Sequence, residues 1–519
     1  MRDPADDARQ RAEDVKTLHA LGYAQELFRG MSGFSNFAIS MSIICIVAGG
    51  LTSLHLGLSG VGGAAVGLGW PLVCLFSLAV AATMGQVASA FPTAGGLYHW
   101  ASILGGRGWG WATAWFNLAG LVTVLTSINV GTFLFLLRPV GAAVGYDPDA
   151  ADPGTRLAVQ LTAVALMTAS QALFNHLGIR VTTRLTDFSG YLIMVMAAAL
   201  TVAALAFAAG WDLGRLVTFA NYSGAAGNDV WPPTASVVWL FTLGLLLPAY
   251  TITGFDASAH TAEETVGAAE QVPRGIVRSV LVSGVFGWVM LCALVLAIPD
   301  MGAAAAQGEG VFHWLVRQVF PPWLAAALYL GIGVAQYLCG LAALTSASRM
   351  TYAFARDRGL PFASALHRVS PTYRTPPAAI WAVAVASVLF AVYTPVFSTI
   401  VTVCTVFLYI SYVLPTAAGF LAHGRTWTAM GPWQLGHWYR PLAVASVVGC
   451  VGLIVIGVQP PNDKALTVVG GSAAVLAAAW FAVERRRFPG PPQGVLLGQR
   501  QAVIEAAERN VGEPTNPHP

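Results

Sequence analysis

Long apolar stretches recur along the whole chain, and short polar segments separate them. A helix needs about 20 apolar residues to cross the hydrocarbon core of a bilayer. The pattern therefore predicts an all-α polytopic membrane protein with twelve transmembrane helices. The predicted spans are 34–58, 67–90, 109–137, 157–176, 187–210, 235–262, 275–298, 322–353, 378–396, 398–422, 440–458 and 465–484.

The composition of the 519-residue chain agrees with this prediction. Hydrophobic residues make up 56% and charged residues 10%, whereas soluble domains carry about 25% charged residues. The net charge of +3 is spread thinly, which argues against a nucleic-acid-binding stripe. The six cysteines all lie in apolar stretches without a CxxC pair, so we expect them to fill space rather than form disulfides or bind metal. Residues 1–33 contain no apolar core, and we expect no cleavable signal peptide.

The positions of lysine and arginine predict the topology. Cytoplasmic segments of membrane proteins carry an excess of these residues. With the N-terminus in the cytoplasm, 22 of the 27 fall on the cytoplasmic side, and Arg138, Arg156, Arg215, Arg317 and Lys464 fall on the other. We therefore expect a multi-pass protein of the cell (plasma or inner) membrane, whose N-terminal tail (1–33) and C-terminal tail (485–519) are both cytoplasmic.

Two of the predicted spans contain residues that interrupt helices. Span 1 carries Ala48, Gly49 and Gly50 at its centre, and span 6 carries Pro248 and Gly254. In a helix interior, glycine costs about 1 kcal/mol relative to alanine and proline about 3 kcal/mol. Either span alone is compatible with an ordinary kink or close helix packing, since both residues are frequent in membrane helices.

The two breaks take matching positions if spans 1–5 and 6–10 are copies of one five-helix unit. An odd number of helices places the second copy in inverted topology, as in many secondary transporters. This predicts a 5+5 inverted repeat of 34–210 and 235–422, followed by two further helices (440–484). Membranes tolerate the unpaired N–H and C=O groups of a broken helix only where these groups line a cavity or ligand. Amides attract a carboxylate and carbonyls attract a cation, so a zwitterionic amino acid suits such a site.

Four segments resemble the amino acid–polyamine–organocation (APC) permease superfamily. They are VAGGL (47–51), FPTAGGLYHWASIL (91–104), GFDASAHTAEET (254–265) and LTSASRMTYAFARDRGLP (344–361). Within the superfamily, the chain is most similar to the branch that carries amino acids, 4-aminobutyrate and choline. The resemblance covers spans 1–10 in order and the two helices after them.

The resemblance also implies a substrate site between spans 1 and 6. It implies that amides at the span 1 break, those of Ala48, Gly49 and Gly50, hold the substrate carboxylate. Carbonyls would hold the amine; they lie near Cys45, Ile46, Tyr250 and Thr253, and the expected substrate-binding set extends to Gly254 and Phe255. Tyr250 is similar to the occlusion gate of the permeases, and the alternative is a tyrosine that only packs in the core.

Acidic residues in span 6 are candidates for chemistry. An ionisable group at membrane depth is a functional candidate by default, and Asp256 could carry a coupling proton or contact substrate. It could instead cap the second half of the broken helix, because aspartate is a favoured N-cap. Glu263 and Glu264 lie further along, and we expect them to be solvated or paired with an arginine such as Arg349.

Span 8 carries a candidate cation site. Ala342, Thr345 and Ser346 share one helical face at i, i+3 and i+4 spacing. In sodium-coupled members of the fold, such oxygens form a sodium site with carbonyls of span 1, here near Ile44 and Val47. The alternative is that the hydroxyls only bond to carbonyls one turn earlier. Some proton-coupled permeases carry a lysine in span 5, and this chain has none there. Transport could therefore be coupled to H⁺, coupled to Na⁺, or proceed by exchange.

These observations favour a secondary active transporter that imports an amino acid or a related small amine, such as 4-aminobutyrate, by alternating access. No ATP-binding motif, catalytic constellation or metal cluster occurs, so we expect no enzyme activity, cofactor or metal. The partners expected are the substrate, the coupling ion and the lipid bilayer. One alternative is a choline or polyamine transporter, whose cation would need an aromatic box; its candidate members are Trp115, Phe116, Tyr250 and Phe255. A membrane sensor or channel is the remaining alternative.

Overall fold

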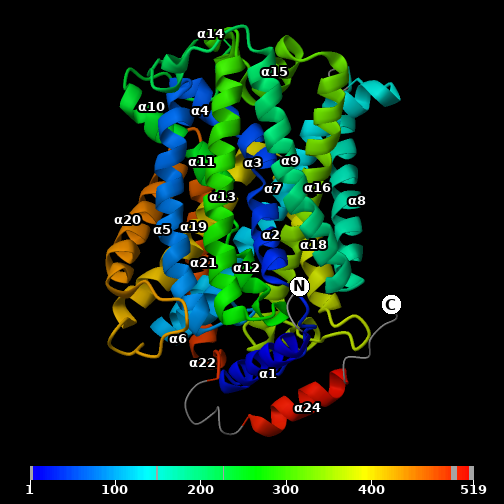
Figure 1. Cartoon of the computed structure of the whole chain (residues 1–519), viewed down its shortest axis with the longest axis vertical. Coiled ribbons are helices and arrows are strands. Elements are labelled where there is room, and N and C mark those ends of the chain that lie inside the picture. The colour runs from blue at the N-terminus through cyan, green and yellow to red at the C-terminus, as the bar shows by residue number, and fades with distance from the viewer. Residues whose placement is uncertain (1–3, 148–149, 226, 395, 493–499, 513–519) are drawn as a thin grey trace.

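The structure is a computed structural model that describes residues 4–147, 150–225, 227–394, 396–492 and 500–512. Over these ranges the chain is almost entirely helical, with two isolated β-bridges. The helices form one elongated bundle (Figure 1). The short helices α1 (Pro4–Ala20) and α24 (Gln501–Val511) lie together at one end of it, called the α1 end here. α14 (Met301–Ala305) and α15 (Val311–Val319) lie at the opposite end, the α15 end.

The apolar helices of the described residues agree with the twelve predicted spans. Ten helical segments in the described ranges are long and apolar enough to span a membrane, and two shorter apolar ones, Val237–Thr251 and Pro377–Tyr393, occupy the predicted spans 6 and 9. Their helices are α2 (Gly33–Ile44), α3 (Ile46–Thr52), α4 (Leu54–Val61), α5 (Trp70–Ala90), α7 (Arg107–Val144), α8 (Pro153–His176), α9 (Ile179–Phe207), α10 (Val237–Gly244), α11 (Leu246–Thr251), α12 (Ala257–His260), α13 (Ala268–Ala297), α16 (Pro322–Arg356), α18 (Pro377–Tyr393), α19 (Phe397–Ala422), α20 (Tyr439–Gly457) and α21 (Asp463–Ala479).

Span 1 is interrupted at a different residue from the predicted one. Cys45 adopts a left-handed conformation (φ 33°, ψ 73°) between α2 and α3. Ala48, Gly49 and Gly50, which the sequence marks as the break, lie inside the helix α3. A left-handed residue costs roughly 1–2 kcal/mol unless it is glycine, so propensity alone does not locate this break.

Span 6 is interrupted where the sequence predicts it. Helix α11 ends at Thr251, and α12 begins at Ala257. Gly254 between them has φ +80°, a conformation that glycine adopts without steric cost. A Cβ atom at Gly254 would overlap Cγ2 of Ile43 in α2. The two breaks are therefore packed against each other in the interior of the bundle.

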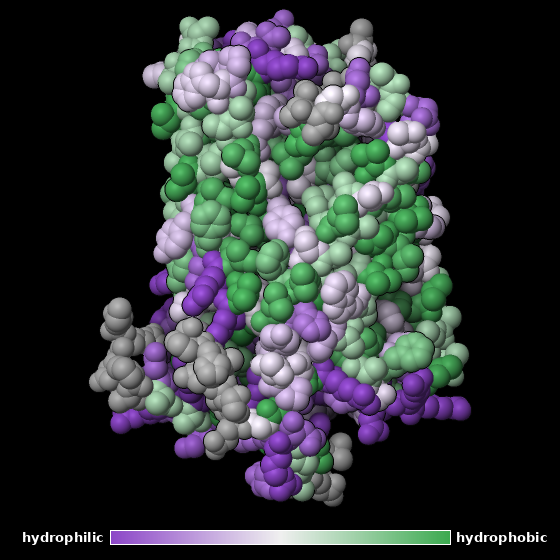
Figure 2. All heavy atoms as spheres, turned by 90° about the vertical axis from the view of Figure 1, so that its right-hand side faces the viewer, coloured by the Kyte–Doolittle hydropathy of each residue, from purple (hydrophilic) through white to green (hydrophobic). Residues whose placement is uncertain are grey.

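Burial separates central spans from peripheral ones. In span 1, 89% of the most apolar window is buried inside the protein, whereas in the last span the figure is 6%. Figure 2 shows a broad apolar band around the middle of one face, with hydrophilic residues gathered at the two ends. This distribution is what a bilayer-embedded bundle requires, because unpaired polar groups are expensive in hydrocarbon.

Candidate functional site

A narrow internal cavity lies beside the two helix breaks. Its volume is about 20 Å³, enough for roughly one water molecule. Side chains from α2, α3, α7, α11, α16 and α19 meet around it. The lining residues are Ile43, Ile44, Ala48, Gly49, Thr52, Val124, Ser127, Ile128, Gly131, Thr132, Tyr250, Thr251, Thr253, Gln336, Cys339 and Phe397.

Some of the predicted substrate-binding residues line this cavity and others flank it. Ala48, Gly49, Tyr250 and Thr253 contribute to the lining, together with Ile44 from the predicted cation site. The flanking residues are Cys45, Ile46, Gly50, Gly254 and Phe255: a Cβ at Gly50 would face Leu291 of α13 at 3.5 Å, and the Phe255 ring packs on Tyr412 with 5.0 Å between centroids.

The backbone groups at the breaks are partly used within the breaks themselves. The amides of Ala48 and Gly49 donate to the carbonyl of Cys45 at 2.7 and 3.0 Å. The hydroxyl of Thr253 donates to the carbonyl of Tyr250 at 2.7 Å. In α3, the first amides are those of Ile46 and Val47, and the first N–H groups of any helix lack an intrahelical acceptor.

Gln336 of α16 stands out among the lining residues. Its side chain is buried, and neither amide atom has a hydrogen-bond partner among the described residues. A buried polar group without a partner costs about 1–3 kcal/mol. Gln336 offers a donor and an acceptor to whatever occupies the cavity.

Tyr250 lies between this cavity and a second one. Its hydroxyl lies 3.3 Å from that of Ser127 in α7, and its ring also lines a second cavity of about 30 Å³. Toward the α15 end, a larger cavity of about 290 Å³ shares Thr52, Gly131 and Phe397 with the first one. The narrow cavity thus adjoins a vestibule on the α15 side.

Asp256 lies just beyond the unwound part of span 6 and is fully buried. Its carboxylate makes no capping bond to the amides of α12. Oδ1 instead accepts from the hydroxyl of Tyr412 at 2.7 Å, and Oδ2 accepts from Nδ2 of Asn117 at 3.2 Å and faces Nε2 of His260 at 3.3 Å. The Tyr412 hydroxyl also accepts from the amide of Gly254 at 3.0 Å, so the carboxylate is linked to the unwound backbone.

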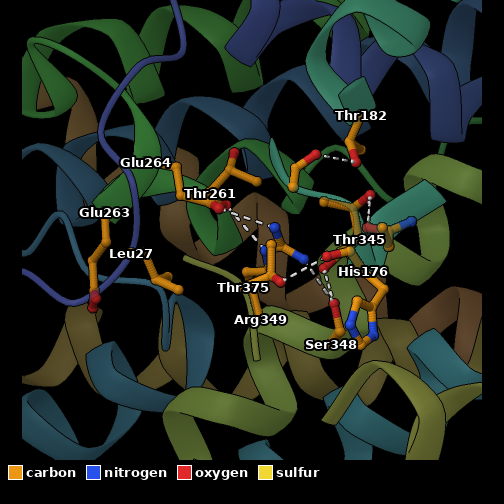
Figure 3. A network of polar contacts seen from close by, with 12 residues as sticks. Leu27, His176, Thr182, Thr261, Glu263, Glu264, Thr345, Ser348, Arg349 and Thr375 are labelled. Atoms are coloured by element: carbon orange, nitrogen blue, oxygen red, sulfur yellow. Dashed lines mark hydrogen bonds and ion pairs between the residues drawn. The ribbon is translucent and has the colours of Figure 1, made fainter. Parts of the chain in front are cut away.

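Buried ion pairs close the α1 end beneath this network. The Arg349 guanidinium donates to both carboxylate oxygens of Glu264, at 2.9 and 3.1 Å, and neither side chain is exposed. Arg356 makes a second two-bond pair with Glu263, at 2.8 and 3.0 Å. Figure 3 shows Arg349 reaching Glu264 on one side and Ser348 on the other. We call these two ion pairs the gate pairs.

The segment before α2 covers the gate pairs from the α1 side. Arg29 donates to the carbonyls of Ala262 and Thr265 at 3.2 and 2.6 Å. Asp14 of α1 accepts from the amide of Gly267 at 2.7 Å and lies 3.7 Å from Arg29. Burial raises the pKa of the Asp14 carboxyl above its ordinary value, against the opposing effect of Arg29 and the amides. Burial likewise lowers the pKa of Arg29, against the effect of Asp14.

Another buried carboxyl, Asp357, follows the end of α16. It accepts from the hydroxyls of Tyr23 and Tyr98 at 2.7 and 2.8 Å. Burial raises its pKa, and the neighbouring Arg356 opposes this effect. The segment before span 1, the short helix after span 2 (Leu97–Gly105) and the end of span 8 are therefore joined at one point.

Three residues of the predicted cation site, Ala342, Thr345 and Ser346, have different surroundings. Thr345 donates its hydroxyl to Oδ1 of Asn175 in α8 at 2.8 Å, and so to a neighbour other than span 1. Ala342 is buried, and the Ser346 hydroxyl has no partner among the described residues. The described residues include no cluster of three His, Cys, Asp or Glu side chains that could hold a metal ion.

The aromatic residues proposed for a choline box are dispersed. Only Tyr250 of the four lines the cavity. Trp115 packs against Trp111 and Phe354, and Phe116 packs against Phe407. The fourth, Phe255, packs on Tyr412 as described above.

Four polar residues around the breaks were not assigned a role from the sequence. Gln336 and Ser127 lie in the cavity lining, and Tyr412 and His260 contact Asp256. For His260 a signal existed, because an ionisable residue one helical turn after Asp256 falls on the same face. For the others, position along a span does not reveal which way a side chain points.

Ten helical segments long enough to span a membrane, two shorter apolar ones and an internal cavity beside two helix breaks characterise the described residues as those of a polytopic membrane protein. Residues 31–481 match the family described as amino acid permease. The chain is 30% identical to the amino-acid permease BAT1 of Arabidopsis thaliana, covering 92% of this chain and 96% of that protein. A homolog of BAT1 from Oryza sativa is 31% identical, with 91% and 94% covered. The GABA-specific permease of Saccharomyces cerevisiae is 27% identical, with 93% and 86% covered.

The chain belongs to the amino acid permease family. This agrees with the resemblance to the APC superfamily noted in the sequence. The relatives are named as permeases, that is, membrane transporters rather than enzymes, and this protein is one of them.

Proposed function

We propose that this permease imports an amino acid or a related small amine, such as 4-aminobutyrate, across the plasma (inner) membrane by alternating access. In this proposal both termini are cytoplasmic, so the α1 end faces the cytoplasm and the α15 end faces outward. The vestibule on the α15 side and the gate pairs at the α1 end then correspond to a state closed toward the cytoplasm.

The observation that carries the proposal is Gln336. Its amide is buried without a partner beside both helix breaks, so a polar solute is the occupant that satisfies it. The cavity of about 20 Å³ is too small for an amino acid. Binding therefore requires span 1 or span 6 to move, as alternating access demands.

The printed name of the yeast relative supports 4-aminobutyrate as one substrate to test, and the names of the plant relatives support amino acids in general. Choline or a polyamine is the alternative. A cation without a carboxylate needs several aromatic faces around it, and a single aromatic of the expected four reaches the cavity. This favours a substrate that has a carboxylate.

The experiment is radiolabelled uptake into proteoliposomes with a panel of amino acids, 4-aminobutyrate and choline. It should be run under separate proton, sodium and exchange gradients. Uptake of amino acids or 4-aminobutyrate that responds to a gradient supports the proposal.

Competition by choline but by no amino acid would overturn the choice of substrate class. Conductance or signalling without uptake would instead support the channel or sensor alternative. Sodium-independent uptake would dismiss the cation site at Ala342, Thr345 and Ser346.

The variant Gln336→Leu tests the cavity. We expect it to reduce uptake by about ten- to a hundredfold at limiting substrate, since a hydrogen bond to a charged group contributes about 1.5–3 kcal/mol. Gln318→Leu, on the exposed face of α15, is the matched control and should transport normally. Equal uptake by the two variants would move the substrate site away from Gln336.

A further inference from the structure

The side chains of Asp256 and His260 form a buried pair at the two ends of the short helix α12, which follows the unwound part of span 6. Both are fully buried. Nε2 of His260 lies 3.3 Å from Oδ2 of Asp256, and Nδ1 lies 3.2 Å from the carbonyl oxygen of Ala94. The imidazole is thus held between two oxygen acceptors, one on each ring nitrogen.

Counting hydrogens shows that both contacts can be hydrogen bonds only if the pair holds one more proton than an ionised carboxylate and a neutral imidazole. A backbone carbonyl can only accept, so Nδ1 must carry a hydrogen to bond with Ala94. A neutral imidazole with its hydrogen on Nδ1 presents a lone pair at Nε2. That lone pair would face an ionised carboxylate, and no hydrogen bond would form between them. A hydrogen bond between Nε2 and Oδ2 forms when one more proton sits on either of these atoms.

We propose that Asp256 and His260 together bind one proton, and that this proton is the coupling ion of transport. The inference rests on the proposed transport function and extends it by naming the ion and its site. Binding the proton changes the charge of the pair from −1 to 0. No other bond is made or broken.

The remaining surroundings do not supply the missing positive charge. Of the elements packed against α12, α16 contributes Arg349 and Arg356, and both are paired with glutamates in the gate pairs. The other described groups that face the pair or its helix carry no charge. They are Tyr412 of α19, Asn117 of α7, Asn36 and Ser40 of α2, and Gly275 of α13. Isolated buried charges are expensive, so Asp256 depends on His260 and its proton.

The pair is connected to both the cavity and the closed end. Through Tyr412, Asp256 holds the amide of Gly254, the residue after Thr253 in the cavity lining. Through Ala94, His260 reaches the gate pairs, because the amide of Ala94 donates to Oε1 of Glu263 at 3.0 Å. The protonated pair therefore joins the substrate cavity to the closure of the α1 end.

Loss of the proton has a mechanical consequence. While the α1 end is closed, it would leave one ring nitrogen without a hydrogen bond, and the pair would carry an uncompensated buried charge. Opening of that end exposes the pair to water and removes both costs. The proton accordingly binds while the α1 end is closed and leaves once that end opens, which couples its movement to the substrate.

The test uses the full chain in proteoliposomes and a substrate that the uptake panel identifies. Three quantities are measured: accumulation under an inward proton gradient, substrate exchange without a gradient, and proton uptake with a pH-sensitive dye. With one proton per substrate, a gradient of one pH unit drives about tenfold accumulation, since 1.4 kcal/mol is a factor of ten.

We expect wild type to show this accumulation together with proton uptake. His260→Gln and Asp256→Asn should retain exchange but lose both, so that their accumulation ratio falls to that of exchange alone. Their exchange should also no longer vary with pH, a readout that a purely structural role would not alter. His437→Gln, at an exposed position before α20, is the histidine control and should behave as wild type.

The two proposals fail in different ways. If wild type transports nothing in the panel, the proposed function is wrong. If wild type transports substrate but moves no proton with it, the inference is wrong and the function stands, even where both variants fail to fold. Proton-driven accumulation that persists in folded His260→Gln and Asp256→Asn also overturns the inference.

Discussion

At the scale of single residues, Gly254 determines how the two broken helices meet. Its φ of +80° lets the chain leave α11 and approach α2, and its missing side chain leaves room for Ile43. The position therefore combines two demands, one on backbone conformation and one on space. Few other glycines in the spans carry both.

Gly254→Ala tests these two demands. We expect it to lower the thermal stability of the purified protein and to reduce uptake, because a left-handed alanine costs roughly 1–2 kcal/mol and its Cβ would overlap Ile43. The double variant Ile43→Ala/Gly254→Ala relieves the overlap but keeps the strain, so the recovery it shows measures the overlap. Gly452→Ala in α20, where a Cβ meets nothing within 4 Å, is the control. A Gly254→Ala protein with unchanged melting temperature and uptake would contradict the prediction.

Sequence reasoning located the glycine at 254 but not the left-handed residue at 45. Glycine and proline indicate a helix break from the sequence alone, because their own backbone properties disfavour a helix. Cys45 has no such property, and it is held in its conformation by the surrounding packing. For the same reason the contacts of Asp256 could be anticipated only as alternatives: its role depends on Tyr412 and Asn117, which come from spans far away in the sequence.

At the scale of secondary-structure elements, the α1 end is closed mainly by charged contacts between span 6 and span 8. Glu264 and Arg349 are both buried and make two hydrogen bonds. The sequence suggested Arg349 as a partner for these glutamates, and the structure pairs it with Glu264. Glu263 pairs with Arg356, which lies further along the same helix, α16. The sequence does not show which glutamate takes which arginine, because both arginines lie near the end of one helix.

Removing one member of the buried Glu264–Arg349 ion pair should lower the stability of the protein. We expect Arg349→Met to destabilise the protein by about 3–5 kcal/mol, because it leaves a buried carboxylate without its partner. The double variant Glu264→Gln/Arg349→Met removes both charges and should be less destabilised than the single one. The exposed pair Glu270–Arg274 on α13 is the matched control, where Arg274→Met should cost about 0–1 kcal/mol. Chemical denaturation in detergent measures these differences, and equal effects at the two sites would refute the argument.

The contact between α1 and the start of α13 gives a prediction about pH. Because burial raises the pKa of Asp14, the folded state binds its proton more tightly than the unfolded state does. Stability then falls as the pH rises from about 4 through the folded pKa. Asp14→Asn lacks this titrating group, so wild type should lose stability relative to the variant as the pH rises through that window. Melting temperatures of both proteins across pH measure this, and a wild type that gains stability relative to the variant over the same window would contradict it.

At the scale of the whole molecule, the sequence predicted the spans well and the ends poorly. Spans are set by long apolar runs, and most predicted bounds lie within a few residues of the helix ends; the helices of spans 5 and 7 begin earlier than predicted, at Ile179 and Ala268. The helices α1, α15 and α24 were not predicted, since each is short and partly polar. They depend on docking against the bundle, which a pattern along one segment does not record. The cavity was predictable as a location between spans 1 and 6 but not as a set of side chains.

The docking of α24 is the clearest case, and it can be tested. Oε1 of Glu508 lies 2.7 Å from Nε2 of His19 in α1 and accepts from the amide of Gln25 at 2.9 Å. Arg374, before α18, donates to the carbonyl of Gly512 after α24 at 2.6 Å. Removing the Glu508 carboxylate should therefore release α24 from the segment that leads into span 1, because Ile504 and Val511 alone provide little buried apolar surface and a short helix is marginal without tertiary packing.

We expect Glu508→Ala to raise hydrogen exchange in residues 501–511 and in the C-terminal part of α1. Helix α2 should stay protected, because the hydrogen bonds of α2 lie within the buried core. Glu505→Ala is the control on the same helix: its carboxylate accepts from Gln501, four residues earlier, and among the described residues it bonds to no residue of α1. It should therefore leave α1 unchanged. Mass spectrometry of peptides from the two regions separates these outcomes. Unchanged exchange in 501–511 of Glu508→Ala would show that the helix is held by contacts other than this carboxylate.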